Sequence, residues 1–557
     1  MNIIRKDIKS AVFRLFNQEI EPNLSRPDYD FGDYSTNVAF ELASRLKKSP
    51  SLIAQSIKTE LEHNPQFSEV NVLNGGFLNF RLKDQEILKL LDFSPKSIFD
   101  DKIIVSEYSN PNPFKQLHVG HLFTSIVGDA ISNLLSEVSS KVYRVNFGGD
   151  IGLHVAINMY AIIQAINDDP SALDKIKPED RSSWLSKMYV SGYEEYNTNE
   201  EAKTKIKKLN KDIYEIAVNN LHDSNLAKIY WTTRDWSYSY FKDFYKHLDI
   251  SFDKYYPESS VAELGLQIVK DNLGRVFMKS DQAIIFEGSK DGVNTYVFVN
   301  SKGVPTYSAK DVGLIFQKKK DFNFDYSVVI TGNEQSDYMR TVLTSVSKID
   351  SGLSEHTIHL THGLVKGFGG AKFSSRLGNA PLAMDLIDET KQAFKKFGDL
   401  DNDLKLVKAA IKYSFLKQKY EGDILYDPKE AVSLEGKSGP YLLYAYVRAL
   451  KIQNSSDFSK EINTFYKKDF ELDQYERKLL FKISEFNDVL ELAINGLKPH
   501  VLAIYLYELA QNFNVFYENV RVLGDPREEI RIFIISEYLR ILKKGLKLLG
   551  IDTISKM

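Results

Sequence analysis

Hydrophobic residues recur at helical spacing along the C-terminal third of the chain, from Leu404 onward. The last stripe of this kind consists of Ile535, Leu539, Leu542, Leu546 and Leu549. Positions three or four apart share one face of an α-helix, and the next residue, Gly550, is of the type that commonly follows a helix end. The pattern predicts an α-helical bundle over residues 391–557.

The first 92 residues alternate short helical patterns with two apolar runs. These runs, Val70–Leu73 and Phe77–Leu82, lie on either side of the turn pair Gly75-Gly76. Short apolar runs bounded by glycine are typical of β-strands. Residues 1–92 are therefore predicted to form a small α/β domain.

Between these two parts the pattern changes to strand, loop and helix. A β-type run covers residues 102–108, a loop with two prolines covers 110–113, and a helical pattern extends from about Gly120 to Leu135. A nucleotide-binding α/β sheet begins with elements in this order.

More strands of the same sheet are predicted at Tyr143–Asn146 and Tyr326–Ile330. Residues 155–300 are rich in aromatic side chains and lysine, and their mixed pattern indicates an insertion without predicting its fold. We therefore expect one α/β domain over residues 100–390, interrupted by this insertion.

Composition changes this picture in two ways. A chain of 557 residues is too long for a single core, so three or four domains are expected. With 72 Lys and Arg against 75 Asp and Glu, the formal net charge is -3, and any contact with RNA has to come from local basic patches.

The chain has no cysteine, which excludes disulfides, cysteine-ligated zinc and a thiol nucleophile. No structural metal held by the protein is expected. The first twenty residues place acidic side chains inside an amphipathic pattern, and no stretch of 18 apolar residues follows, so a cytoplasmic location is expected.

The strongest chemical signal is the tetrapeptide His118-Val119-Gly120-His121, at the start of the predicted helix. A helix N-terminus presents unpaired N–H groups and partial positive charge, which suits a triphosphate. Two histidines there can reach phosphate oxygens, and Gly120 leaves room for a flat base or ribose. The alternative is that one histidine caps the helix and the other lies on the surface.

A second motif lies far downstream, Gly370-Ala-Lys372-Phe-Ser-Ser-Arg376-Leu-Gly-Asn379. Alone, it is equally consistent with a surface turn. In this order, however, the two motifs resemble the HIGH-type and KMSKS-type signatures of class I aminoacyl-tRNA synthetases. The resemblance implies a Rossmann-like catalytic domain that uses ATP together with Mg²⁺.

Further segments are similar to arginyl-tRNA synthetases in particular. The string SNPNPFKQLHVGHL looks like that family's form of the first signature. Segments 30–37 and 75–80 are similar to its added N-terminal domain, which contacts tRNA. The segments that resemble its anticodon-binding helical domain are 439–446, 507–513 and 545–551. The resemblance implies a monomeric enzyme that activates L-arginine with ATP and transfers it to the 3′-terminal adenosine of tRNA(Arg).

The family's site residues are carried over only where this sequence matches its motifs. Arginine would be contacted by Glu107, Asn112, His118, Tyr307, Asp311 and Gln335. ATP would be contacted by His118, Gly120, His121, Gly332, Glu334, Lys372 and Ser374. Carboxylates and amides suit a guanidinium, which is a flat cation with five donors, and Tyr307 and Asp311 at i and i+4 share one helix face.

Catalytic roles are implied for His118, His121, Lys115 and Lys372. In the implied reaction the carboxylate of arginine attacks the α-phosphate of ATP, and the terminal ribose of tRNA then takes the arginyl group. The histidines would neutralise developing charge, and Lys372 would hold the leaving phosphates.

The sequence departs from the family pattern in its second signature and in its ribose contact. Ser375 stands where a second lysine is usual, and Phe373 stands in place of methionine. Lys115, three residues before His118, is expected to supply the missing cation. The usual ribose-binding Gly-x-Asp reads Gly332-Asn-Glu334, so the ribose contact of Glu334 is in doubt.

Three alternatives stay open from the sequence. The chain could be a different class I synthetase, or an RNA-binding relative without catalysis, although intact His118, His121 and Lys372 oppose the latter. A small-molecule ligase that forms adenylates could also carry the first signature. Such a ligase would have no need of the C-terminal helical domain.

Overall fold

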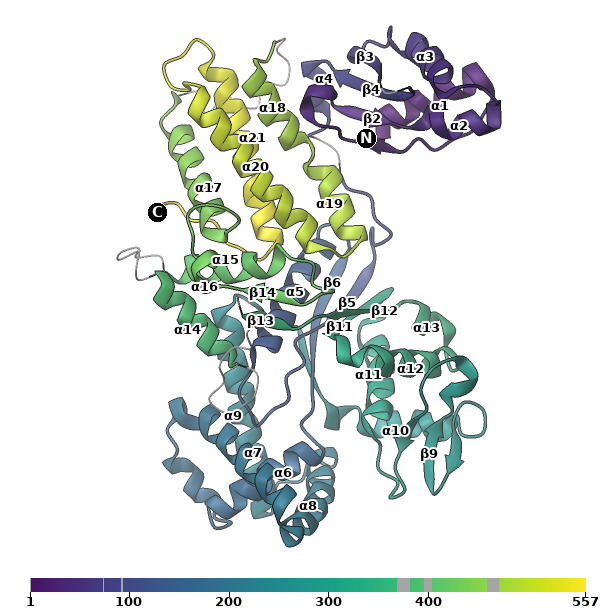
Figure 1. Cartoon of the computed structure of the whole chain (residues 1–557). Coiled ribbons are helices and arrows are strands. Elements are labelled where there is room, and N and C mark those ends of the chain that lie inside the picture. The colour runs from purple at the N-terminus through teal and green to yellow at the C-terminus, as the bar shows by residue number, and fades with distance from the viewer. Residues whose placement is uncertain (1, 74, 92–93, 368–380, 395–402, 458–469) are drawn as a thin grey trace.

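The computed structural model describes residues 2–73, 75–91, 94–367, 381–394, 403–457 and 470–557. Figure 1 shows an N-terminal domain beside the upper end of the C-terminal helices, a central sheet beneath them, and two lobes at the bottom. None of the described helices is both long enough and apolar enough to span a bilayer.

The central sheet has five parallel strands in the order β12-β11-β5-β6-β7. Their bounds are β5 Ile103–Glu107, β6 Lys141–Gly148, β7 Lys254–Pro257, β11 Tyr326–Gly332 and β12 Thr357–His362. The three strands expected from the sequence are confirmed as β5, β6 and β11. The chain runs from β5 toward one edge and then returns to β11 on the other side, so the strand order reverses beside β5, where α/β sheets bind ligands.

Strand β7 lies inside the range 155–300 that the sequence marked as an insertion. It pairs with β6 and so belongs to the central sheet. The rest of the range forms parts of the two lobes (Figure 1). One lobe contains α6 Leu153–Ala165, α7 Arg181–Thr198, α8 Glu200–Val218 and α9 Asn225–His247, which enclose a core of their own.

The second lobe covers one face of the sheet. It contains α10 Ala262–Asp271, α11 Tyr307–Phe322, α12 Ser336–Ser347, α13 Ser351–Glu355 and the antiparallel strands β8 Met278–Ser280, β9 Ala283–Phe286 and β10 Tyr296–Val299. Valine and phenylalanine side chains from these elements pack against Val105 and Val329 of the sheet. This packing brings the first turn of α11 beside the ends of the strands.

Helix α5, Val119–Leu135, covers the opposite face, and the predicted helix at about 120–135 is confirmed. It is apolar nearly all round, as a helix buried on every side should be. Besides the sheet it contacts α14 Ala383–Phe394, α15 Asp403–Leu416, α19 Phe486–Asn495, α20 Pro499–Asn519 and α21 Glu528–Leu548. Helix α5 therefore joins the central sheet to the C-terminal helices.

The C-terminal helices form the predicted bundle, completed by α16 Pro428–Ala431, α17 Gly439–Asn454 and α18 Gln474–Ser484. The hydrophobic stripe ending at Leu549 is buried, and Gly550 adopts φ +69° just beyond α21. That left-handed conformation ends the helix and favours glycine. A short parallel pair, β13 Val365–Gly367 and β14 Ile424–Tyr426, links this region to the central domain.

The N-terminal domain is the predicted small α/β unit. Its antiparallel sheet has the order β1-β2-β4-β3, and the two expected strands are confirmed as β3 Phe67–Leu73 and β4 Phe77–Leu82, which pair as a hairpin. The other elements are α1 Asn2–Phe16, β1 Leu24–Ser25, β2 Tyr34–Thr36, α2 Val38–Leu46, α3 Pro50–Leu61 and α4 Asp84–Lys89.

One buried arginine joins this domain to the bundle. Arg477 of α18 donates to both carboxylate oxygens of Asp33, at 3.0 and 2.8 Å, and to Asp84 at 2.9 Å. Asp33 is fully buried and Arg477 is 8% exposed. A buried ion pair of this kind fixes orientation because either partner alone would be an uncompensated charge.

Arg477→Met is expected to lower stability by about 3–5 kcal/mol, because it leaves the Asp33 carboxylate buried and unpaired. Urea unfolding followed by circular dichroism should show an earlier first transition. Arg14→Met is the matched control, since Arg14 pairs with Glu60 at 2.8 Å while 59% of its own side chain is exposed. Equal midpoints for the two variants would show that the Arg477 pair does not hold the domain.

Candidate active site

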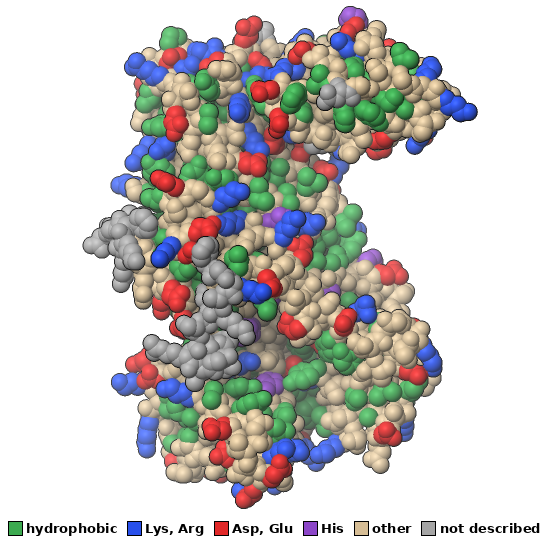
Figure 2. Space-filling model, viewed as in Figure 1, with side chains coloured by type: hydrophobic (Ala, Val, Ile, Leu, Met, Phe, Trp, Pro, Cys, Tyr) green, Lys and Arg blue, Asp and Glu red, His purple; other side chains and the backbone are tan. Residues whose placement is uncertain are grey.

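A cavity of about 1080 Å³ opens at the carboxyl ends of the central strands. Each of the five strands brings residues to it, in or just beyond the strand: Glu107 from β5, Gly149 from β6, Glu258 from β7, Gly332 from β11 and His362 from β12. Because the strands are parallel, all their carboxyl ends meet at one edge of the sheet. Figure 2 shows the molecule hollowed between the two lower lobes, with histidine and hydrophobic side chains at the rim.

Most of the residues expected from the sequence line this cavity. They are Glu107, Asn112, His118, Gly120, His121, Tyr307, Asp311, Gly332, Glu334 and Gln335. Lys115 is not among the lining residues. Lys372, Phe373, Ser374, Ser375 and Arg376 lie outside the described residues. The geometry below therefore concerns the first signature, the strand ends and the first turn of α11.

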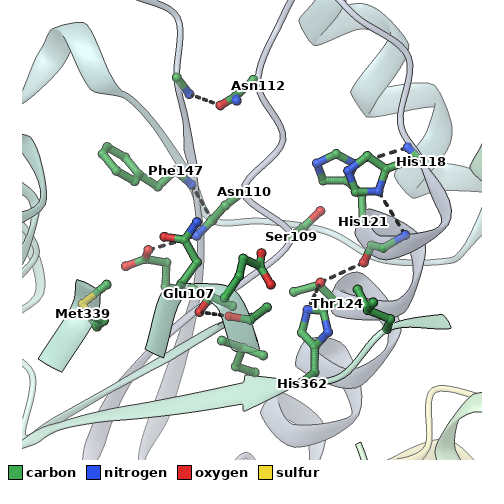
Figure 3. Close-up of a pocket in the computed structure, with 18 of the residues that line it drawn as sticks. Glu107, Ser109, Asn110, Asn112, His118, His121, Thr124, Phe147, Met339 and His362 are labelled. Atoms are coloured by element: carbon green, nitrogen blue, oxygen red, sulfur yellow. Dashed lines mark hydrogen bonds between the residues drawn. The ribbon is translucent and has the colours of Figure 1, made fainter. Parts of the chain in front are cut away.

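The two signature histidines cap α5 reciprocally. His118 Nδ1 accepts from the Gly120 N–H at 3.1 Å, and His121 Nδ1 accepts from the His118 N–H at 3.3 Å. The rings lie 3.8 Å apart between centroids, side by side in Figure 3. Burial lowers the pKa of His118 to about 4 and also lowers the pKa of His121, so both rings are neutral near pH 7. A neutral imidazole that accepts at Nδ1 carries its proton on Nε2.

This geometry modifies the expected role of the histidines. From the sequence, the histidines were expected to neutralise developing charge directly. In the structure they are instead uncharged and can act as hydrogen-bond donors through Nε2–H. It also adds a reason for glycine at position 120, because a Cβ there would lie 2.9 Å from Cε1 and Nδ1 of His118. The ring of His118 occupies the space that any larger residue would need.

Two carboxylates of the cavity already have lysine partners. Lys318 Nζ donates to Glu107 Oε2 at 2.5 Å and to Ser327 Oγ at 3.0 Å, and it is fully buried. Asn110 donates to the other oxygen of Glu107 at 3.1 Å, as Figure 3 shows. Lys310 pairs with the buried Glu258 in the same way. The charges of Glu107 and Glu258 are therefore largely compensated within the protein.

Asp311 has a different environment. Asp311 accepts a hydrogen bond from the hydroxyl of Tyr338, which is uncharged near pH 7. The pKa of Asp311 is raised to about 7, mainly by burial and also by the nearby charges of Glu107 and Glu258, while the Tyr338 hydrogen bond and the charge of Lys310 oppose the shift. The ionised carboxylate of Asp311 is thus unfavourable in the ligand-free protein. A cationic ligand in this cavity would stabilise that carboxylate.

The remaining expected residues surround these groups. The Tyr307 side chain, one helical turn before Asp311, is half exposed to the cavity. Asn112 accepts from the Gly149 N–H at 3.0 Å, which holds the loop after β5 against β6. Glu334 and Gln335 lie on the short 3-10 turn Asn333–Gln335 after β11.

Lys115 lies beside the histidines and outside the cavity wall. Its ammonium is 5.8 Å from the ring centre of Tyr189 on α7. Burial lowers the pKa of Lys115, and its positive charge contributes to the lowered pKa of His118 and His121. The ammonium is therefore near enough to influence the charge state of both histidines.

Several residues of the site were not identified from the sequence. Glu258 and His362 follow or end strands β7 and β12, so the rule that ligands bind at strand ends would have marked them had these strands been predicted. Thr124, one turn after Gly120, contacts His362 Nε2 through Oγ1 at 2.6 Å. Lys310 and Lys318 carried no signal, because lysines on a helix are normally solvated.

Three family models match successive parts of the chain. The model described as tRNA synthetases class I (R), catalytic domain, matches residues 86–413. The Arginyl tRNA synthetase N terminal domain matches residues 2–82, and the DALR anticodon binding domain matches residues 442–557. Together the three matches cover the same succession of domains as the structure.

Curated relatives are similar over nearly their whole length. The arginine–tRNA ligase of Borrelia garinii subsp. bavariensis is 28% identical, over 97% of this chain and 95% of the relative. That of Flavobacterium psychrophilum is 27% identical, over 100% and 99%. Among solved structures, arginyl-tRNA synthetases of Thermus thermophilus (TM-score 0.79, 23% identity, 100% of both chains) and Plasmodium falciparum (TM-score 0.80, 22% identity, 100% and 99%) share the fold.

Asp311→Asn is expected to raise the melting temperature of the ligand-free protein by a few degrees at pH 8. The carboxyl has a pKa near 7 when folded and an ordinary value of 3.8, so its ionisation penalises the folded state increasingly as pH rises from about 4 through 7. The gain should shrink as pH falls toward 4. Asp337→Asn, at a side chain that is 70% exposed, is the control and should change little at either pH. An unchanged melting temperature for Asp311→Asn at pH 8 would contradict the buried, uncompensated charge.

Proposed function

We propose, on the premise that the chain belongs to the class I tRNA synthetases of the arginyl type, that the cavity at the strand ends binds arginine and ATP together. The chain is an arginine–tRNA ligase, which joins arginine to tRNA(Arg) and converts ATP to AMP and diphosphate. The observation that carries the assignment of the site is one cavity with a helix N-terminus at one side and an uncompensated carboxylate, Asp311, at the other.

The phosphates of ATP fit the α5 side. The first turn of α5 offers N–H groups and the positive end of the helix dipole to an anion. The Nε2–H groups of His118 and His121 are free of the helix cap and can donate to oxygens of the α-phosphate. Since both rings are neutral, they stabilise the transition state by directed hydrogen bonds, which a dry cavity strengthens. Gly332 and Glu334, after β11, are proposed to face the adenosine.

The guanidinium of arginine fits the α11 side. Asp311 supplies a full negative charge, and Tyr307, one turn away, supplies a hydroxyl oxygen. Glu107, Asn112 and Gln335 are proposed as further contacts, with Glu107 held in place by Lys318 and Asn110. A bidentate pairing of a carboxylate with a guanidinium is both strong and directional.

Catalysis by this arrangement consists mainly of positioning. The carboxylate of arginine is held in line with the α-phosphate, diphosphate leaves, and the terminal ribose of tRNA then accepts the arginyl group. Mg²⁺ is expected to accompany the ATP. In the parts of the chain that the structure describes, no group of three or more His, Asp or Glu could hold a metal ion, and no step is assigned to it.

Other assignments remain predictions. Lys372 and Ser374 are proposed to bind the phosphates from the second signature, which lies outside the described residues. Residues 1–92 are proposed to contact the tRNA body and residues 391–557 its anticodon, in line with the family models that match there. We further propose that the enzyme acts as a monomer in the cytoplasm.

Exchange of radioactive pyrophosphate into ATP, measured with each amino acid in the presence of total tRNA, tests the proposed function. Only arginine should support exchange, and arginine alone should become attached to tRNA. Exchange with another amino acid at a comparable rate would overturn the assignment of the cavity to arginine.

Asp311→Asn is expected to raise the KM for arginine by about 30- to 1000-fold, equal to roughly 2–4 kcal/mol, with little effect on the KM for ATP. In the wild type, arginine binding must expel the proton from Asp311. The KM for arginine should therefore rise about tenfold as pH falls from 8 to 6, through the folded pKa of about 7. The variant should lack this pH dependence. A wild-type KM for arginine in the variant would show that Asp311 does not contact arginine.

Lys115→Ala is expected to lower kcat by about 10²–10³ with little change in the KM for arginine, because its charge would meet the phosphates mainly in the transition state. Lys187→Ala, which removes an exposed lysine of α7, is the matched control. Adding Ser375→Lys to Lys115→Ala should restore part of the rate by returning a cation from the second signature. Wild-type turnover in Lys115→Ala would end the idea that Lys115 compensates for the missing lysine.

A further inference from the structure

His154 stands behind Tyr307 and does not itself line the cavity. It lies in the first turn of α6, just after the loop that follows β6. Its Nε2 is 2.8 Å from the carbonyl oxygen of Gly149, and its Nδ1 is 3.2 Å from the hydroxyl oxygen of Tyr307. The three groups form a short hydrogen-bonded chain from the backbone to the cavity wall.

Which groups donate and which accept in this series of hydrogen bonds follows from the carbonyl of Gly149. A carbonyl oxygen can only accept, so Nε2 of His154 must carry a proton and donate it to Gly149. In a neutral imidazole the other nitrogen, Nδ1, is then an acceptor. The hydroxyl of Tyr307 has a single proton, which it must donate to Nδ1. Its oxygen is left facing the cavity with lone pairs only.

The surroundings of His154 keep the ring neutral and in place. Burial lowers the pKa of His154 to about 4, and the positive charges of Lys115 and Lys310 act in the same direction. Gly152, at φ +121°, lies beside the pair. A Cβ at that position would lie 3.3 Å from the Tyr307 hydroxyl and 3.4 Å from His154 Nδ1. The absence of a side chain at Gly152 therefore leaves room for the hydrogen bond between Tyr307 and His154.

We propose that His154 is a positioning residue that makes the enzyme discriminate between arginine and its uncharged isostere, citrulline. The inference rests on the proposed contact of Tyr307 with the guanidinium. A guanidinium has only donors, and a hydroxyl oxygen that offers only lone pairs matches it. The ureido group of citrulline replaces one NH₂ by a carbonyl oxygen. Held against lone pairs, that oxygen is left without a donor.

This discrimination differs from that of Asp311. Asp311 selects for charge, whereas His154 removes the donor that would otherwise let Tyr307 adapt to either ligand. If His154 stops accepting, the Tyr307 proton is free to turn into the cavity and donate to a ureido oxygen. Specificity of this kind arises because citrulline is denied a hydrogen bond from Tyr307 to its ureido oxygen.

The test compares two substitutions of similar size. In His154→Gln, the amide NH₂ can donate to Gly149 while the amide oxygen accepts from Tyr307. Both hydrogen bonds therefore keep their donors and acceptors on the same sides. In His154→Leu, neither bond is possible. The measured quantity is the inhibition constant of citrulline divided by the KM of arginine, in aminoacylation assays of the full-length enzyme with tRNA(Arg).

His154→Leu should lower this ratio by about tenfold, the value of one misdirected hydrogen bond, whereas His154→Gln should retain most of the wild-type ratio. Should His154→Leu fail to fold, His154→Met, with a weakly accepting thioether, takes its place. A wild-type ratio in the leucine or methionine variant, or an equal loss in His154→Gln, would overturn the proposal.

Tyr307→Phe separates this inference from the function on which it rests. If Tyr307→Phe leaves the KM for arginine unchanged, the proposed contact of Tyr307 is wrong. If Tyr307→Phe raises that KM while His154→Leu keeps the wild-type ratio, the contact stands and the role of His154 is wrong. In the double variant Tyr307→Phe with His154→Leu, the second change should alter the ratio no further, because the proton that His154 directs is gone.

Discussion

Burial of helix α5 on all sides is the constraint on which the rest of this structure depends. Its N-terminus holds the two signature histidines in a reciprocal cap, and its sides pack against both the central sheet and the C-terminal helices. In the middle of α5, Gly128 lies so close to Tyr108 that a Cβ would be 2.2 Å from the ring. Buried Lys412 of α15 donates to the carbonyl of Gly550 at 2.6 Å, and this bond closes the contact with the end of α21. The catalytic groups and the anticodon-binding helices thus share one rigid element.

The electrostatics of the cavity follow from which carboxylates the protein itself compensates. Glu107 and Glu258 are each paired with a buried lysine from α11, so their positions are fixed and their charges are largely offset. Asp311, on the same helix, lines the cavity and accepts a hydrogen bond from the hydroxyl of Tyr338. Burying an unpaired carboxylate costs stability, and that cost is recovered when a cation enters. If arginine binds as proposed, this charge in the ligand-free state favours a positively charged substrate.

Hydrogen-bond direction is the second means by which this site recognises its ligands. His118, His121 and His154 are all neutral, and in each the backbone or a neighbouring group determines which nitrogen carries the proton. The first two present donors toward the side of the cavity where phosphates would lie. The third turns the hydroxyl of Tyr307 so that only lone pairs face the other side. In the proposed complex, donors would meet the anion and acceptors would meet the cation, without a charged histidine at either end.

The sequence by itself determined the local elements and the family, whereas tertiary structure decided how the groups of the site are paired. Strand β5, helix α5 and the stripe on α21 were predictable because periodicity and helix-end residues act within a few positions along the chain. Strand β7 was hidden in an aromatic, lysine-rich segment, so Glu258 beside it was missed. Lys310, Lys318 and His154 gave no local signal, since their partners are 52, 211 and 153 residues away in the chain. Such contacts arise only when the parallel sheet brings its strand ends together and the packing of α11 and α6 removes water from between them.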